Sequence, residues 1–219
     1  MVRTLLLDLD GTLVDSVPDL AAAVNRLMRS RGLPEFSNQD VAAMVGDGIA
    51  ILTSRAFAAH NLQPDANAVD DLASDYAIHV AVHSRLYPGV PDTLAGLVGQ
   101  GWRLAICTNK PEPAARKLLE AVGLISLFAA IGGGDSFPVR KPDPGHLLAT
   151  LASAGGQPDS CLILGDHRND VMAAAGAGVP SIFAAWGYGS LDMAAGSAGI
   201  AHNIQEAAAI ANRLLPLRD

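Results

Sequence analysis

The 219-residue chain carries near its start the stretch that decides its fold, Leu5-Leu6-Leu7-Asp8-Leu9-Asp10-Gly11-Thr12-Leu13-Val14-Asp15-Ser16. Residues 2–7 form an apolar run that only Arg3 and Thr4 interrupt, which is typical of a parallel strand covered on both faces. In open α/β sheets the carboxyl ends of the strands form the ligand crevice, so Asp8 and Asp10 are expected there. Both side chains should share one face, because side chains alternate along a strand with a period of two.

The two aspartates also predict a metal site. Neighbouring buried carboxylates repel one another unless a cation or a proton compensates their charge. Two oxygen ligands with no nearby His or Cys suit a hard ion such as Mg²⁺. Gly11 allows the chain to turn, and Thr12 offers a hydroxyl and a backbone N–H beside the carboxylates. The alternative interpretation is that Asp10-Gly11 is only a turn dipeptide at a strand end.

Composition limits the classes of protein to which the chain can belong. Half of the residues are hydrophobic and 17% are charged, which indicates a globular protein with a sizeable core. A net charge of −7 argues against a general binder of nucleic acid or of anionic membranes. Cys107 and Cys161 lie in apolar runs without metal spacing and are expected to be buried free thiols. With no signal peptide and no run of membrane length, a cytoplasmic location is predicted, whereas no feature predicts the oligomeric state.

The order of helical and strand patterns predicts two parts. Between Val14 and Leu86 no strand is expected, and four helical runs are predicted, over residues 17–31, from the capping box of Ser37 and Asp40 onward, and over 49–60 and 66–84. Strands and helices alternate afterwards. This pattern predicts an α/β fold with a Rossmann-like parallel sheet and an inserted all-α cap, the core comprising residues 1–14 and 88–219 and the cap residues 15–87.

Further polar residues follow the later predicted strands. The strand over 102–107 leads to Thr108 and Asn109, which can cradle phosphate oxygens near a helix N-terminus. The strand over 161–164 leads to Asp166, with Asp170 on the opening turn of the next helix, while Lys141 lies in a proline-rich loop. Taken singly, Lys141 is more often a solvated lysine and Asp170 a helix-starting acid.

Together these segments resemble the haloacid dehalogenase superfamily, in its phosphatase branch with a C1 helical cap. Its four motifs match, in order, Asp8 through Ser16, Thr108-Asn109-Lys110, Arg140-Lys141-Pro142, and Gly165-Asp166 through Asp170 to Ala174. Val45-Gly46-Asp47-Gly48 through Arg55-Ala56 is most similar to the phosphoglycolate phosphatase group. His167 stands where the family often has Ser.

The resemblance implies a Mg²⁺-dependent phosphatase that hydrolyses a small phosphate monoester, with 2-phosphoglycolate as the leading candidate, through an aspartyl-phosphate. It implies that Asp8 is the nucleophile and Asp10 the acid and base, and that Thr108 and Lys141 hold the phosphoryl group. The implied metal ligands are Asp8, the Asp10 carbonyl, Asp166 and Asp170. The implied substrate-binding residues are Gly11, Thr12 and Asn109 in the core and Gly46, Gly48 and Arg55 in the cap, with Arg55 expected to pair with a substrate carboxylate.

Other activities fit less well or stay open. Dehalogenases of this superfamily lack an acid two residues after the nucleophile, and phosphonatases need a lysine in the cap, where this chain has none. A sugar-phosphate mutase, or a phosphatase of broad specificity for sugar or nucleotide phosphates, would share every core motif. A receiver-type signalling domain also combines an acidic site with Thr and Lys, but such domains are shorter and lack the insertion.

Overall fold

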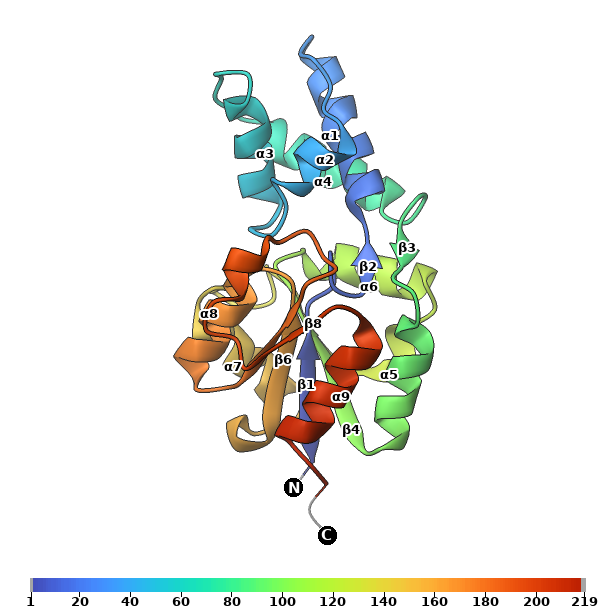
Figure 1. Cartoon of the computed structure of the whole chain (residues 1–219). Helices are drawn as coiled ribbons and strands as arrows, with labels where there is room; N and C mark the ends of the chain where they lie inside the picture. The colour runs from blue at the N-terminus through green and yellow to red at the C-terminus, as the bar shows by residue number, and fades with distance from the viewer. Residues whose placement is uncertain (1, 218–219) are drawn as a thin grey trace.

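Figure 1 shows a computed structural model of the protein, which describes residues 2–217. A larger α/β core forms the lower part of the view, and a group of four helices stands above it as a cap. The predicted fold class, a Rossmann-like parallel sheet with an inserted helical cap, is thereby confirmed.

The core is built on a six-stranded parallel sheet with the order β5-β4-β1-β6-β7-β8. These strands are β1 (Arg3–Leu7), β4 (Trp102–Cys107), β5 (Phe128–Gly132), β6 (Cys161–Gly165), β7 (Ser181–Ala184) and β8 (Gly199–Ala201). The first strand of the chain, β1, pairs with β4 on one side and β6 on the other, and all of its residues are buried. The decisive stretch of sequence therefore enters the site from the middle of the sheet.

Five helices cover the two faces of the sheet. They are α5 (Val90–Gly99), α6 (Glu112–Ala121), α7 (Pro144–Ser153), α8 (Arg168–Ala177) and α9 (Ile204–Leu214). The side chains of α5, α6 and α9 pack with Leu5 and Leu7 of β1, whereas those of α7 and α8 pack with Leu6, which points the other way. Short 3-10 helices cover Ile125–Leu127, Pro158–Ser160 and Leu191–Ala194.

The cap consists of α1 (Val17–Ser30), α2 (Asn38–Ala42), α3 (Ile49–Ala58) and α4 (Ala68–His79). The capping box that predicted the start of α2 is present, since Ser37 and Asp40 each bond to the backbone N–H of the other. The most extensive packing within the cap joins α1 to α4 and to α2. Buried Leu20, Val24 and Leu72 lie in this packing.

Two short strands connect the cap to the core, where the sequence predicted no strand. In this ribbon, β2 (Val14–Asp15) runs antiparallel to β3 (Arg85–Leu86), with Val14 opposite Leu86 and Asp15 opposite Arg85. Each strand is only two residues long, so a period of two could not be recognised in the sequence. For the same reason β8, with three residues, was not predicted at the edge of the main sheet.

The last cap helix, α4, ends at His79, before the end of the helix predicted over 66–84. The carboxylate of Asp19 on α1 accepts backbone N–H bonds from His83 (2.9 and 3.0 Å) and from Ser84 (2.8 Å). Those N–H groups are therefore not available to helix carbonyls, and the chain turns towards β3. A contact between distant residues sets this boundary.

Two other expectations concern the cysteines and the possibility of a membrane span. Cys107 and Cys161 are free and buried, as predicted, and burial raises the pKa of each thiol to about 12. Within residues 2–217, every helix is too short or too polar to span a lipid bilayer.

Candidate active site

Asp8 is the first residue after β1 and is held in place where the carboxyl ends of the parallel strands meet, which we call the carboxyl edge or sheet edge. Its backbone N–H donates to the Leu164 carbonyl of β6 at 2.9 Å, so strand pairing continues through this position. Its Oδ1 accepts the Leu9 N–H at 2.8 Å and lies 3.1 Å from Lys141 Nζ. The carboxylate is therefore oriented by the backbone and by a buried cation.

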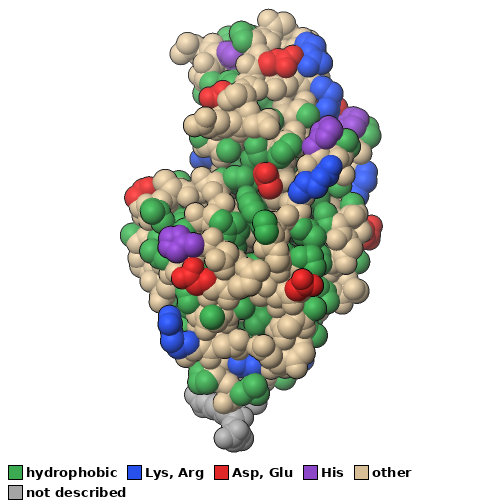
Figure 2. Space-filling model, turned by 45° about the vertical axis from the view of Figure 1, so that its right-hand side comes forward, with side chains coloured by type: hydrophobic (Ala, Val, Ile, Leu, Met, Phe, Trp, Pro, Cys, Tyr) green, Lys and Arg blue, Asp and Glu red, His purple; other side chains and the backbone are tan. Residues whose placement is uncertain are grey.

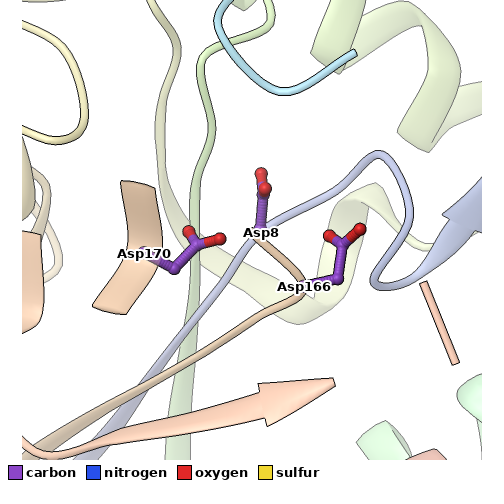
Figure 3. A group of neighbouring side chains, drawn as sticks. All are labelled: Asp8, Asp166 and Asp170. Atoms are coloured by element: carbon purple, nitrogen blue, oxygen red, sulfur yellow. The ribbon is translucent and has the colours of Figure 1, made fainter. Parts of the chain in front are cut away.

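Asp166 and Asp170 reach the same place from the end of β6 and the start of α8. One carboxylate oxygen from each of Asp8, Asp166 and Asp170 lies within 4.8 Å of the other two. In Figure 3 the three carboxyl groups gather around a common space at the strand ends. The sequence predicted these three side chains as metal ligands, and the fold brings them together.

Asp166 is fixed by the first loop and by the loop after β7. Thr12 donates its hydroxyl to Asp166 Oδ1 at 2.9 Å, and the Tyr188 N–H donates to Oδ2 at 2.8 Å. Gly11 has a φ of +79°, and a Cβ at this position would collide with Asp166 Oδ2. Only glycine lets the first loop pass this close to the carboxylate.

Lys141 is buried between two of the acids, so it is not a solvated loop lysine. Its Nζ lies 2.6 Å from Asp170 Oδ1 and 3.1 Å from Asp8 Oδ1. Burial alone would lower the pKa of Lys141, but the charges of Asp170 and Asp8 outweigh it and raise the pKa above its ordinary value. Lys141 therefore stays positively charged.

When all of its carboxylates are ionised, this cluster has an excess of negative charge that a divalent cation would balance. Three carboxylates against one ammonium leave two negative charges uncompensated. Burial, together with the charges of Asp8 and Asp170, raises the pKa of Asp166 to about 8. Burial also raises the pKa of Asp170, against the opposing effect of Lys141. All-oxygen ligands with this charge fit Mg²⁺.

Asp10 has a different set of partners. Its Oδ1 accepts the Ser16 hydroxyl at 2.5 Å, and its two oxygens lie 2.9 and 3.0 Å from Lys110 Nζ. Its carboxylate is thus separate from the acidic cluster, and a role for Asp10 in metal binding would rest on its backbone carbonyl.

Lys110 was not assigned a role from the sequence, although it is the third residue of the segment Thr108-Asn109-Lys110. Besides Asp10, its Nζ donates to the Tyr76 hydroxyl at 2.6 Å and lies 4.4 Å from the Tyr76 ring centroid. Tyr76 belongs to α4, so this contact joins the cap to the core. Burial opposes the charged form of Lys110, but Asp10 and Tyr76 outweigh it and raise the pKa of Lys110. Its position in the sequence, directly after the Thr-Asn pair that ends a strand, could have indicated that Lys110 lies in the site.

The cap loop over residues 43–48 rests on the core at its glycines. The carbonyl of Gly46 accepts bonds from the side-chain amides of Asn109 (3.0 Å) and Asn169 (3.2 Å). Asn109 also donates to the Lys141 carbonyl at 2.9 Å, so its amide nitrogen holds two loops together. Gly46 has a φ of +123°, and a Cβ there would lie 2.7 Å from the ring of His167.

His167, which stands where the family often has Ser, therefore forms part of the core surface on which the cap loop rests. This contact between the loop of residues 43–48 and the core is called the seat of the cap below. Its Nδ1 accepts the Asn169 N–H at 3.3 Å, and its own N–H donates to Asp170 Oδ2 at 3.1 Å. This reciprocal pair caps α8 where it begins at Arg168, so Asp170 lies in the first turn of the helix, as predicted. Burial lowers the pKa of His167, which favours the neutral ring.

A cavity of about 260 Å³ lies where the cap meets the core. Figure 2 shows the smaller lobe standing on the larger one, with hydrophobic side chains near their junction. The core lines the cavity with charged and polar residues, and the cap lines it mainly with apolar ones. The predicted site residues among them are Asp8, Asp10, Gly46, Gly48, Thr108, Asn109 and Asp166. A volume of this size suits a small ligand.

Arg55, expected to contact a substrate carboxylate, does not line this cavity. Its guanidinium forms an ion pair with Asp47 and donates to the Met44 carbonyl at 2.8 Å, both within the cap. It lines a separate hollow beside Arg140 and Pro142. The role of Arg55 was implied by the resemblance of the segment Val45-Gly46-Asp47-Gly48 through Arg55-Ala56, and a sequence match does not specify towards which side a guanidinium points.

Comparison with known proteins agrees with this geometry. A sequence profile described as "Haloacid dehalogenase-like hydrolase" matches residues 5–184. A phosphoglycolate phosphatase of Agrobacterium fabrum is 40% identical over 190 residues, which cover 85% of this chain and 82% of the relative. A phosphoglycolate phosphatase of Pseudomonas putida is 42% identical over 191 residues, which cover 85% of this chain and 70% of the relative.

Solved structures show the same arrangement of core and cap. The crystal structure of a predicted phosphoglycolate phosphatase from Haemophilus somnus superimposes with a TM-score of 0.88 at 31% sequence identity. The superposition covers 95% of this chain and 97% of the other. The similarity therefore extends over the core, the cap and their connection.

Proposed function

Since this chain belongs to the haloacid dehalogenase-like hydrolase family, we propose that it is a Mg²⁺-dependent phosphatase of small phosphate monoesters, with 2-phosphoglycolate as its substrate. The observation that carries the proposal is the cluster of Asp8, Asp166, Asp170 and Lys141 at the carboxyl ends of β1 and β6. The curated relatives named phosphoglycolate phosphatase support the choice of substrate.

Asp8 is the nucleophile in this proposal. Its Oδ1 is held by the Leu9 N–H and by Lys141, which leaves Oδ2 to attack phosphorus. The bond between Oδ2 and phosphorus forms as the bond from phosphorus to the ester oxygen breaks, giving an aspartyl-phosphate and an alcohol. Lys141 and the Thr108 hydroxyl hold the phosphoryl oxygens during this displacement.

Asp10 moves the proton in both halves of the reaction. In its protonated form it donates to the leaving ester oxygen, and as a carboxylate it then takes a proton from the water that hydrolyses the aspartyl-phosphate. Ser16 and Lys110 hold this carboxyl group at the cavity wall. The cap above it excludes bulk water from the reacting atoms.

Mg²⁺ would be held by Asp8, Asp166 and the Asp10 carbonyl, with Asp170 in support, and when bound it neutralises charge on the nucleophile and the phosphoryl group. The other groups act independently of that role. Lys141 orients Asp8, and Thr12 and the Tyr188 N–H orient Asp166. The chain thus presents a preorganised site.

The test is a screen of small phosphate esters for phosphate release, with and without Mg²⁺. The set should include 2-phosphoglycolate, sugar phosphates, nucleotides and an aryl phosphate. We expect Mg²⁺-dependent release with the highest kcat/KM for 2-phosphoglycolate. Release that persists in EDTA would contradict the metal role, and negligible turnover of 2-phosphoglycolate would contradict the substrate.

A further inference from the structure

Lys110 lies at the cavity wall beside Asp10, and the sequence did not indicate a role for it. We propose that Lys110, held by Tyr76 of the cap, binds the carboxylate of the leaving group and thereby selects 2-phosphoglycolate. This inference rests on the proposed phosphatase function and names the residue that determines its specificity. It replaces Arg55, whose guanidinium is paired with Asp47 outside the cavity.

Charge on the cavity wall supports this assignment. Among the described residues that line the cavity, Lys110 is the one lysine or arginine. The acidic side chains of the wall, Asp8, Asp10 and Asp166, would repel a carboxylate. Lys141 lies behind Asp8 and Asp170 and serves the phosphoryl end. Among the described residues of this wall, a ligand with an anionic group at each end therefore finds its second lysine or arginine at Lys110.

The position of Lys110 matches the structure of the substrate. In 2-phosphoglycolate the carboxylate is attached to the carbon that bears the leaving oxygen, so it lies next to the atom that Asp10 protonates. Lys110 Nζ lies 2.9 and 3.0 Å from the two oxygens of Asp10. A cation that touches the acid is therefore within reach of a carboxylate attached one carbon beyond the leaving oxygen.

In this arrangement all three donors of Lys110 are engaged, so carboxylate binding requires Asp10 to release one of them. An ammonium carries three N–H groups, and two of its contacts go to the two oxygens of Asp10 while the third goes to the Tyr76 hydroxyl. When Asp10 turns one oxygen to the leaving group, one donor of Lys110 becomes available to the carboxylate. The apolar cap residues Leu20 and Leu52 line the same cavity, and apolar walls lower the dielectric and strengthen an ion pair inside it.

The experiment measures binding without turnover, because Lys110 also touches the proposed acid. In an Asp8→Asn background, titration calorimetry gives the Kd of intact 2-phosphoglycolate and of 2-hydroxyethyl phosphate, in which a neutral CH₂OH replaces the carboxylate. Adding Lys110→Met should weaken 2-phosphoglycolate on the order of 10- to 100-fold and 2-hydroxyethyl phosphate by less than about threefold. In the same Asp8→Asn background, Lys110→Arg in place of Lys110→Met should weaken 2-phosphoglycolate binding less, because the positive charge is kept.

The matched control is Arg55→Met in the same background, which removes a cation outside the cavity and should change both values equally and little. Circular dichroism melts check that each variant is folded. Equal weakening of both ligands by Lys110→Met would overturn the inference and leave Lys110 as a positioning residue for Asp10. If the unmodified protein hydrolyses other esters but neither binds nor hydrolyses 2-phosphoglycolate, the proposed substrate fails, and the inference fails with it.

Discussion

The carboxyl edge of the sheet and the cap enclose one cavity, but they contribute different kinds of group to it. The sheet edge supplies the acids Asp8, Asp10 and Asp166 and the cation Lys110, all close behind a strand. Of the described cap residues that line the cavity, only Tyr76 has a polar side chain; the others are Leu20, Ala42, Ala43, Val45, Gly46, Gly48, Ile49 and Leu52. The charged groups of the cavity wall thus come from the carboxyl ends of the core strands and the loops that follow them, whereas the cap contributes apolar side chains and the hydroxyl of Tyr76.

The largest effect should come from the sheet edge. Asp8→Asn should lower kcat for 2-phosphoglycolate by about 10⁴-fold or more, because it removes the proposed nucleophile. The melting temperature should stay the same or rise, since the change removes one of three clustered buried charges while Lys141 keeps Asp170. Phosphate release and thermal melts measure the two effects.

The control for this variant is Asp159→Asn, which alters an exposed carboxylate before β6, at the opposite end of the strand. It should change neither quantity. Mass spectrometry must show that the amide introduced by Asp8→Asn has not deamidated. Turnover by intact Asp8→Asn protein near the level of the unmodified enzyme would remove Asp8 from the mechanism.

The second effect couples metal binding to pH. The pKa of Asp166 is raised to about 8, above its ordinary value near 4, so the metal-free folded state binds an extra proton between these values. The contribution of this group to stability therefore falls as pH rises from about 4 to about 8. Mg²⁺ favours the charged carboxylate, so the rise in melting temperature on adding Mg²⁺ should be larger at pH 8.5 than at pH 6.

Differential scanning calorimetry in EDTA and in Mg²⁺ at the two pH values measures this dependence, and phosphate release should cease in EDTA. Asp166→Asn serves as the comparison, because it has no proton to lose in this range. An equally large, pH-dependent Mg²⁺ shift in Asp166→Asn would assign the effect to other groups.

A smaller effect should follow from disturbing the seat of the cap. Gly46→Ala places a methyl group against the ring of His167 at a φ that L-residues rarely adopt, so the cap loop cannot sit as closely on the core. We expect kcat/KM to fall about 10- to 100-fold, with a loss of stability of about 1–2 kcal/mol or less. Steady-state kinetics and urea unfolding separate the two.

A matched comparison is Gly32→Ala, at a cap glycine with positive φ and open space around it. It tests backbone strain without the contact to the core. If Gly32→Ala reduced kcat/KM as much as Gly46→Ala does, the seat of the cap would not matter for turnover.

The smallest effect should come from Arg55. Arg55→Ala removes a half-exposed ion pair within the cap, so stability should fall by about 1 kcal/mol or less. kcat/KM for 2-phosphoglycolate and for an aryl phosphate should change equally, by less than about threefold. Measuring both substrates decides the point: a selective loss on 2-phosphoglycolate would restore Arg55 as the carboxylate partner.

The residues at the carboxyl edge of the sheet could be predicted from sequence because they directly follow segments with a strand pattern. Each of Asp8, Thr108 and Asp166 follows an apolar strand, and parallel strands bring their carboxyl ends together. Lys141 could be assigned to this edge only through the family resemblance, since no strand ends beside it. In the folded chain it lies buried between Asp8 and Asp170.

The cap was harder to interpret because its functional contacts join residues that are distant in sequence. Tyr76 reads as one member of an apolar helix stripe, and only the packing of α4 against the core brings its hydroxyl to Lys110. Arg55 reads as a free cation, but Asp47, eight residues earlier, pairs with it. Tertiary contacts, which local periodicity does not encode, decided both cases.

The ribbon of β2 and β3 has a consequence for the redesign of this protein. Because Asp15 lies opposite Arg85, the points where the chain leaves and re-enters the core are adjacent. In topological terms the whole cap is one long hairpin loop, and a short turn from Asp15 to Arg85 would leave the strand order β5-β4-β1-β6-β7-β8 unchanged. A different insertion placed between Asp15 and Arg85 should therefore leave the order of the sheet strands intact.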